Sequence, residues 1–135
     1  MVSLRGLNCY LARPEGDGSR GLRGGSELQV FLLAGALRRR GHEVSVVVTD
    51  YSGDALRAPR LSEVRLIQAY DNDAGLPGVR FLHPRWSGLR RALGAADAEV
   101  YFQRGASAAT GQAAHTCAAL ARPFVFGAAS DSDTD

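Results

Sequence analysis

The middle of the chain constrains the fold more than any other part. Residues 26–40 have the spacing of a helix that is apolar on most sides, and residues 43–50 form a valine-rich run. Gly41 separates the two segments, at the position where a left-handed glycine commonly ends a helix. Glu27 and the three arginines of 38–40 lie at the helix ends that suit their charges. A helix followed at once by a continuous β-branched strand is typical of a parallel sheet covered on both faces.

The remaining segments alternate between strand and helix patterns. The sequence predicts strands over 4–12, 61–70, 99–103 and 123–128, helices over 86–96 and 107–121, and loops over 13–25 and 71–84. This order implies right-handed crossovers and a Rossmann-like, doubly wound parallel α/β sheet. At 135 residues the chain is long enough for one domain, residues 1–135. Because the chain stops just after a core strand, we interpret it as an incomplete domain.

Composition narrows the functional classes. All 16 cationic residues are arginines, the net charge is +2, and the basic residues are spread out, so we expect no nucleic-acid partner. Cys9 and Cys117 are far apart and are interpreted as buried thiols of a reducing compartment. No apolar run approaches the roughly 18 residues of a membrane span, and no signal-peptide pattern begins the chain. These features predict a cytoplasmic protein, with peripheral contact of its loops to the inner face of a membrane left open.

One glycine motif indicates a different class of protein. The segment Gly16–Gly21 matches G-x-G-x-x-G, and Asp50 ends the next strand, where the ribose-binding acid of a dinucleotide site lies. However, residues 13–15 separate this motif from the preceding strand, and the helical pattern begins only near Ser26. A dinucleotide-binding oxidoreductase module is therefore kept as the alternative interpretation.

A second glycine motif lies at the start of the helix itself, where a phosphate or a sugar hydroxyl would meet free backbone N–H groups. This motif consists of Gly24, Gly25, Ser26 and Glu27. The order of this motif, the apolar helix, the Arg-Gly-His-Glu-Val turn over 40–44 and the valine-rich strand resembles the N-terminal domain of family 4 glycosyltransferases. Segments 96–104 and 122–131 are similar to later strands of that family that end at its cleft. The resemblance runs from about residue 24 to the C-terminus.

This resemblance implies the two-domain GT-B fold and a retaining transfer of sugar from a nucleotide-sugar donor to an acceptor hydroxyl. It also implies that neither a metal nor another cofactor is required. The N-terminal domain would mostly shape the acceptor side, and its glycine loop would approach the phosphates of the donor. The family's second domain carries a Glu-x7-Glu motif, and no glutamates of this chain have that spacing. We therefore expect the donor-binding C-terminal domain to be missing and the chain alone to be inactive, and a non-catalytic Rossmann-like remnant is a further alternative.

The resemblance, together with the rule that open α/β sheets bind ligands at the carboxyl ends of their strands, selects the candidate site. The substrate-binding candidates are Gly24, Gly25, Ser26, Glu27, Gln103, Arg104, Ser130 and Asp131. Arg104 has a guanidinium that can pair bidentately with a phosphate or a carboxylate. Many family members carry histidine where this chain has Ser130-Asp131, so no catalytic residue is assigned.

Two features suggest metal binding at first sight. The Asp-x-Asp of residues 131–133 binds a divalent metal in another glycosyltransferase fold, but two carboxylates without a third ligand make a poor site. We favour a polar loop or a contact with the acceptor there. His42, His83 and His115 lack the spacing of metal ligands, and we expect no metal site.

Overall fold

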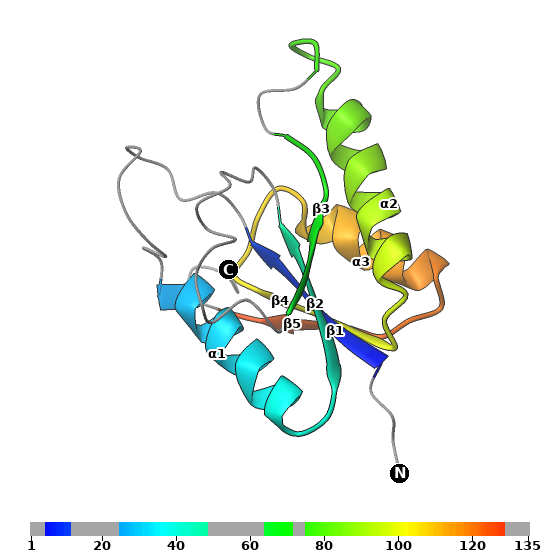
Figure 1. The fold of residues 1–135 in the computed structure, drawn as a ribbon. Coiled ribbons are helices and arrows are strands. Elements are labelled where there is room, and N and C mark those ends of the chain that lie inside the picture. Colours follow the sequence, from blue (N-terminus) through cyan, green and yellow to red (C-terminus); the bar gives the residue numbers. More distant parts are fainter. Residues whose placement is uncertain (1–4, 12–24, 49–63, 72–74, 129–135) are drawn as a thin grey trace.

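The computed structural model describes residues 5–11, 25–48, 64–71 and 75–128 (Figure 1). Its strands are β1 (Arg5–Leu11), β2 (Glu43–Val48), β3 (Arg65–Gln68), β4 (Val100–Arg104) and β5 (Phe124–Gly127). Its helices are α1 (Gly25–Arg39), η3 (Phe81–Trp86), α2 (Ser87–Ala96) and α3 (Thr110–Ala119). The strands form a parallel sheet in the order β3-β2-β1-β4-β5. The Rossmann-like, doubly wound fold predicted from the sequence is confirmed.

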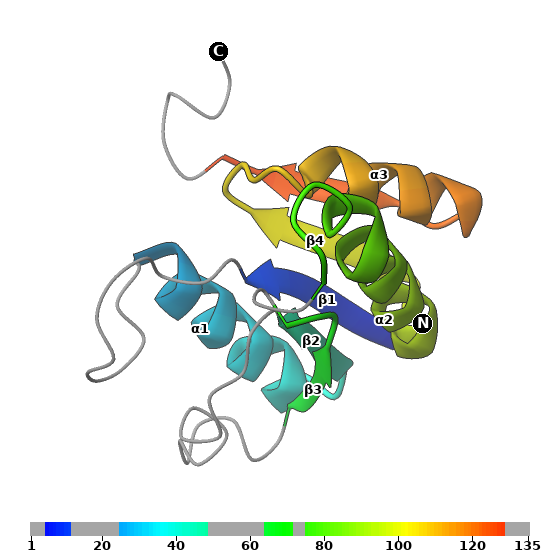
Figure 2. The same ribbon diagram turned by 90° about the horizontal axis from the view of Figure 1, so that it is seen from above.

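The helices form a layer on each face of the sheet. Figure 2 shows α1 on one face and α2 with α3 on the other. The chain leaves β1 through α1 to reach β2 on one side, whereas β4 lies on the other side of β1. The strand order therefore reverses between β1 and β4, which makes this the topological switch point of the sheet.

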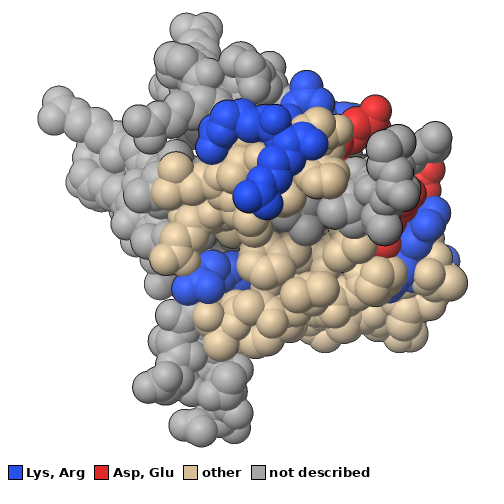
Figure 3. All heavy atoms as spheres, turned by 90° about the horizontal axis from the view of Figure 1, so that it is seen from below, with Lys and Arg blue, Asp and Glu red and all other residues tan. Residues whose placement is uncertain are grey.

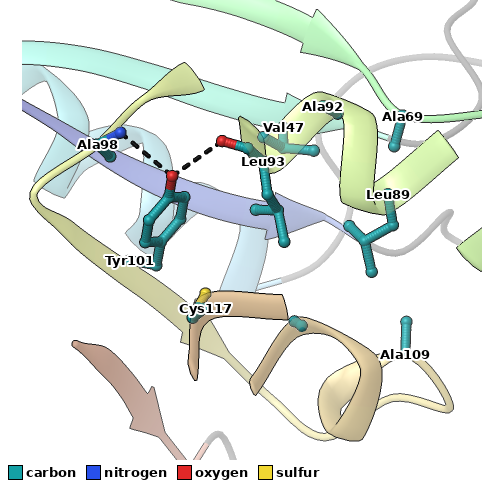
Figure 4. Packing of buried hydrophobic residues seen from close by; sticks show 10 residues of the cluster. Val47, Ala69, Leu89, Ala92, Leu93, Ala98, Tyr101, Ala109 and Cys117 are labelled. Atoms are coloured by element: carbon teal, nitrogen blue, oxygen red, sulfur yellow. Dashed lines mark hydrogen bonds between the residues drawn. The ribbon is translucent and has the colours of Figure 1, made fainter. Parts of the chain in front are cut away.

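Each face of the sheet has its own hydrophobic core. On the α1 face, Val30 and Ala34 of the helix are buried with every second residue of β2, namely Val44, Val46 and Val48. On the opposite face, Val47 is buried with residues of α2, β4 and α3, including Leu89, Tyr101 and Cys117 (Figure 4). Because the side chains of a strand alternate between faces, β2 contributes to both cores. The prediction of a strand buried on both faces is confirmed.

The turn from α1 into β2 has the predicted glycine stop. Gly41 has a φ of +87°, in the left-handed region. Its N–H donates to the carbonyl oxygen of Arg38 at 2.9 Å, and the N–H of His42 donates to that of Leu37 at 3.1 Å. These bonds satisfy carbonyls at the end of the helix, and the following strand begins two residues after Gly41.

Several predicted boundaries differ from the structure. The segment 71–84 was predicted to be a loop, but helical turns already begin at Phe81. The sequence prediction missed them because the proline and glycine residues of this segment indicate a loop. The helix predicted from Ser107 begins at Thr110. The strand predicted over 61–70 is limited, among the described residues, to Arg65–Gln68.

Candidate functional site

The candidate site lies at the carboxyl edge of the sheet, beside the switch point between β1 and β4. All five strands are parallel, so their carboxyl ends meet at the same edge. The backbone of α1 begins there at Gly25, and that of α3 begins there at Thr110. This is the position at which open α/β sheets bind ligands.

Gln103 shapes the loop that follows β4. Its side chain is 1% exposed, and its Nε2 donates to the carbonyl oxygen of Gly105 at 2.9 Å and to Oγ1 of Thr110 at 2.7 Å. The amide thus ties the end of β4 to the start of α3. This arrangement makes Gln103 a positioning residue for the loop, and its predicted contact with substrate stays a prediction.

Ser107 and Thr110 complete the same loop. The N–H of Ser107 donates to Oγ1 of Thr110 at 2.9 Å, and the N–H of Ala109 donates to Oγ of Ser107 at 3.3 Å. These bonds hold the backbone of the loop directly before α3, which begins at Thr110. The sequence interpretation did not select these residues for the site, because no motif in the sequence marks them.

Arg104 lies on the α1 side of the sheet. Phe102, two residues earlier in β4, packs against the core beneath α1, and alternation places Arg104 on the same face. Arg104 is half-buried, and its Nε is buried without a hydrogen-bond partner among the described residues. Gly127 is its partner in β5 and has no side chain that could cover it. The guanidinium therefore shares a face and an edge with the first turn of α1.

The surface around this face is largely uncharged. Figure 3 views the molecule from the α1 side and shows a broad tan area, with arginine side chains in separate groups. Leu32 and Val125, which belong to α1 and β5, are among the large apolar residues exposed in the described part of the chain.

The other predicted site residues are described only in part. Gly25, Ser26 and Glu27 form the first turn of α1, for which the structure describes the backbone alone. Gly24, Ser130 and Asp131 lie outside the described residues, as do the alternative glycine motif of 16–21 and Asp50. The substrate contacts of all these residues remain predictions.

The titratable groups of the core have structural roles. Burial raises the pKa of the Cys117 thiol to about 11, so the thiol is protonated at neutral pH. Burial also raises the pKa of Tyr101, whose hydroxyl donates to the carbonyl oxygen of Leu93 at 2.8 Å and accepts from the N–H of Ala98 at 3.2 Å (Figure 4). The burial of Cys117 confirms half of the prediction of two buried thiols; the side chain of Cys9 is outside the description.

His83 and His115 each contact a nearby side chain. Nδ1 of His83 lies 2.8 Å from Oγ of Ser87, and the ring of His115 meets the ring of Trp86 edge-on at 6.0 Å between centroids. In the ranges that the structure describes, no three His, Cys, Asp or Glu residues are grouped so that they could hold a metal ion. That the chemistry needs no metal stays a prediction.

The doubly wound sheet with a switch point at its carboxyl edge defines a Rossmann-like domain. A sequence profile described as Glycosyltransferase Family 4 matches residues 23–128. Since this match covers most of the chain, the protein belongs to glycosyltransferase family 4, as the resemblance of its glycine loop and Arg-Gly-His-Glu-Val turn suggested.

A solved structure with the same fold belongs to a different kind of protein, a hydrogenase. The C-terminal domain of a hydrogenase from Pyrococcus furiosus superimposes with a TM-score of 0.62 at 14% identity, over 94% of this chain and 93% of that domain. At this identity the likeness concerns the fold alone. Among curated proteins no sequence relative was found. In the described ranges, no helix has the length and apolarity needed to cross a membrane.

Proposed function

We propose that this chain forms the acceptor-side domain of a retaining glycosyltransferase that moves a sugar from a nucleotide-sugar to an acceptor hydroxyl. Membership of glycosyltransferase family 4 supports the reaction class. The observation that carries the proposal is Arg104, a half-buried arginine whose Nε has no described partner, at the carboxyl edge beside the start of α1. We propose that the anion in contact with Arg104 is the diphosphate of the donor.

The chemistry explains why such an arrangement is useful. When the bond between the sugar and the diphosphate breaks, negative charge develops on the departing phosphate oxygen. A guanidinium donates two parallel hydrogen bonds to such an anion, and the unsatisfied N–H groups of a helix N-terminus add a positive potential. Donors that are already in position stabilise this charge without reorganising during the reaction. In the proposal, Arg104 supplies the first contribution and the first turn of α1 supplies the second.

The loop after β4 supports this arrangement indirectly. Gly105 has a φ of +79° and donates its N–H to the carbonyl oxygen of Gly127 at 2.9 Å. Together with the amide of Gln103, this bond fixes the backbone directly after Arg104. We propose that the acceptor hydroxyl approaches along this loop, while a second domain supplies most of the donor site.

Binding of the leaving group tests the proposal without requiring turnover. Uridine diphosphate and guanosine diphosphate are titrated into the protein by calorimetry, and Arg104→Gln is compared with Arg104→Lys. Removing a charge-assisted contact should weaken the better-bound diphosphate at least about tenfold in Arg104→Gln. Arg104→Lys should lose less, because it keeps the charge but not the bidentate geometry.

Arg39→Gln serves as the matched control, since this exposed arginine lies in the last turn of α1, at the far end of that helix. It should leave the affinity unchanged. Equal affinities for all four proteins would overturn the assignment of Arg104. Saturable binding of a nicotinamide dinucleotide with no diphosphate binding would instead favour the oxidoreductase alternative, and the absence of any nucleotide binding would overturn the assignment of Arg104 to the diphosphate.

A further inference from the structure

The segment that enters α2 has an unusual surface. Among the described residues, nine large hydrophobic side chains are exposed, and four of them lie within residues 76–82. They are Leu76, Val79, Phe81 and Leu82, with exposed fractions of 74%, 54%, 50% and 54%. In Figure 1 this green segment projects at the top, away from the sheet. Exposed apolar side chains that gather in one place commonly mark an interaction surface.

The segment has a defined shape. The N–H of Arg80 donates to the carbonyl oxygen of Leu76 at 2.9 Å, and the N–H of His83 donates to that of Val79 at 3.1 Å. Gly75 has a φ of +97°, and a Cβ there would lie 2.6 Å from Cδ of Pro84. Only glycine therefore allows the segment to close on itself. The apolar side chains are presented outward by hydrogen-bonded turns.

The base of the segment is anchored to the sheet. Gly88, in the first turn of α2, is buried, and a Cβ at this position would overlap the carbonyl oxygen of Ala69, just after β3. This close approach fixes the start of α2 against the end of β3. The projecting segment is thus held at the carboxyl end of β3 by a rigid support.

The charge of this region is one-sided. Residues 75–96 contain Arg80, Arg85, Arg90 and Arg91 and no acidic residue, so they carry +4. The rest of the chain has twelve arginines and all 14 acidic residues, a net charge of −2. The positive net charge of the protein therefore arises from the region that also exposes the apolar cluster.

We infer that residues 75–96 dock the protein peripherally on an anionic lipid bilayer. Leucine and phenylalanine side chains would enter the boundary between head groups and acyl chains, while the exposed Arg80, Arg90 and Arg91 contact lipid phosphates. Apolar residues flanked by arginines are the composition of interfacial membrane-binding segments. Each basic residue near an anionic surface adds to the binding. This docking is independent of the transfer reaction proposed above.

A protein partner fits the same surface less well. The cluster consists of four exposed apolar side chains, whereas each side of a stable protein interface involves about 20–30 residues. The uniform positive charge, without acidic residues between the arginines, would also oppose pairing with a second copy of the same surface. A bilayer needs neither a large matching area nor a complementary charge pattern.

Sedimentation with lipid vesicles tests this inference. Vesicles of phosphatidylcholine are compared with vesicles that also contain phosphatidylglycerol. Leu82→Asp should lower the partition coefficient at least about tenfold, because a leucine no longer enters the interface. Leu32→Asp is the matched control, since Leu32 is equally exposed at 54% but lies on α1. It should change partitioning by less than about twofold, as a surface change remote from the contact.

Charge variants and fluorescence sharpen the test. Arg80→Gln and Arg90→Gln should each weaken binding to the anionic vesicles about fivefold. Arg39→Gln should not. Trp86, the one tryptophan of the chain, is half-buried and packs edge-on against His115, so its emission wavelength should stay unchanged on binding and serves as a check that the fold is retained.

Three results would overturn the inference. The first is no sedimentation with either vesicle, and the second is an equal loss of binding in Leu82→Asp and Leu32→Asp. The third is self-association in analytical ultracentrifugation that Leu82→Asp abolishes, which would assign the surface to a second copy of the chain. Thermal unfolding followed by circular dichroism verifies that each variant is folded.

Discussion

The two faces of the sheet differ in how completely they are covered. On the face of α2 and α3, Tyr101 and Gln103 of β4 are 2% and 1% exposed. On the face of α1, Phe102 of the same strand is half-buried, and Val125 beside it in β5 is 48% exposed. One strand thus contributes its odd-numbered residues to a closed core and its even-numbered residues to an open surface that ends in Arg104. Over β4 and β5 the packed core thus lies on the first face and the candidate ligand contacts lie on the second, whose own core is over β2.

The largest expected effect tests the closed face. Leu89 in α2 is fully buried in the core shared by α2, β4 and α3. Leu89→Ala should lower the free energy of unfolding by about 2–5 kcal/mol, since it removes buried methyl groups and leaves a cavity. The measurement is urea unfolding followed by circular dichroism. Leu32→Ala on the exposed side of α1 should cost less than about 0.5 kcal/mol, and similar losses for both would contradict the comparison.

The second prediction concerns alkaline pH. Folding raises the pKa of the Cys117 thiol from 9.0 to about 11, so the folded state holds a proton that the unfolded state releases. The stability due to this thiol is therefore complete below pH 9 and is lost as the pH rises to 11, by on the order of 2–3 kcal/mol. The free energy of unfolding, measured between pH 8 and 11, should fall less steeply with pH in Cys117→Ala than in the unmodified protein. Parallel curves for the two proteins would show that the thiol is not buried as described.

A smaller effect is expected from the hydroxyl of Tyr101. Its two hydrogen bonds join the end of α2 to the turn before β4. Tyr101→Phe leaves the carbonyl oxygen of Leu93 and the N–H of Ala98 without that partner, at a cost of about 1–2 kcal/mol. Chemical unfolding measures this loss. A neutral result would mean that water replaces the hydroxyl and that this part of the closed face is solvated.

The smallest effect tests the open face. Val125→Thr changes an exposed side chain and should alter stability by no more than about 0.5 kcal/mol. The matched variant Val47→Thr places a hydroxyl in the closed core, where Val47 is 0% exposed, and should cost about 1–3 kcal/mol. Thermal unfolding of the two variants side by side gives the contrast. Equal effects would mean that the open face is covered in solution.

Sequence patterns predicted the fold because local signals agreed along most of the chain. The valine run of β2 and the glycine stop at Gly41 depend on residues next to each other in sequence, and both are present as predicted. The segment around Phe81 was missed because Pro77, Gly78 and Pro84 indicate a loop, whereas its helical turns depend on Gly75 closing against residues 80–84. Contacts of this kind between loop residues are not visible as a periodic pattern.

The candidate site was predictable in position and less so in detail. The carboxyl-edge rule selected Gln103 and Arg104 from their place at the end of a strand. The sequence could not distinguish the two, because their burial depends on which face of the sheet is covered. Gln103 points into the closed face and bonds to the loop, whereas Arg104 lies on the open face. Because these neighbouring residues lie on opposite faces, Gln103 has a positioning role and Arg104 is the candidate ligand contact.

The most direct test of the proposed site is an NMR titration of the isotope-labelled protein with a nucleoside diphosphate. The account predicts that amide signals of the first turn of α1 and of Arg104 and Gly105 shift saturably. It also predicts that signals of α3 beyond its first turn, such as Ala118, stay in place, and that the shifts are lost in Arg104→Gln. Saturable shifts confined to the α2 and α3 face, or shifts that Arg104→Gln leaves unchanged, would contradict it.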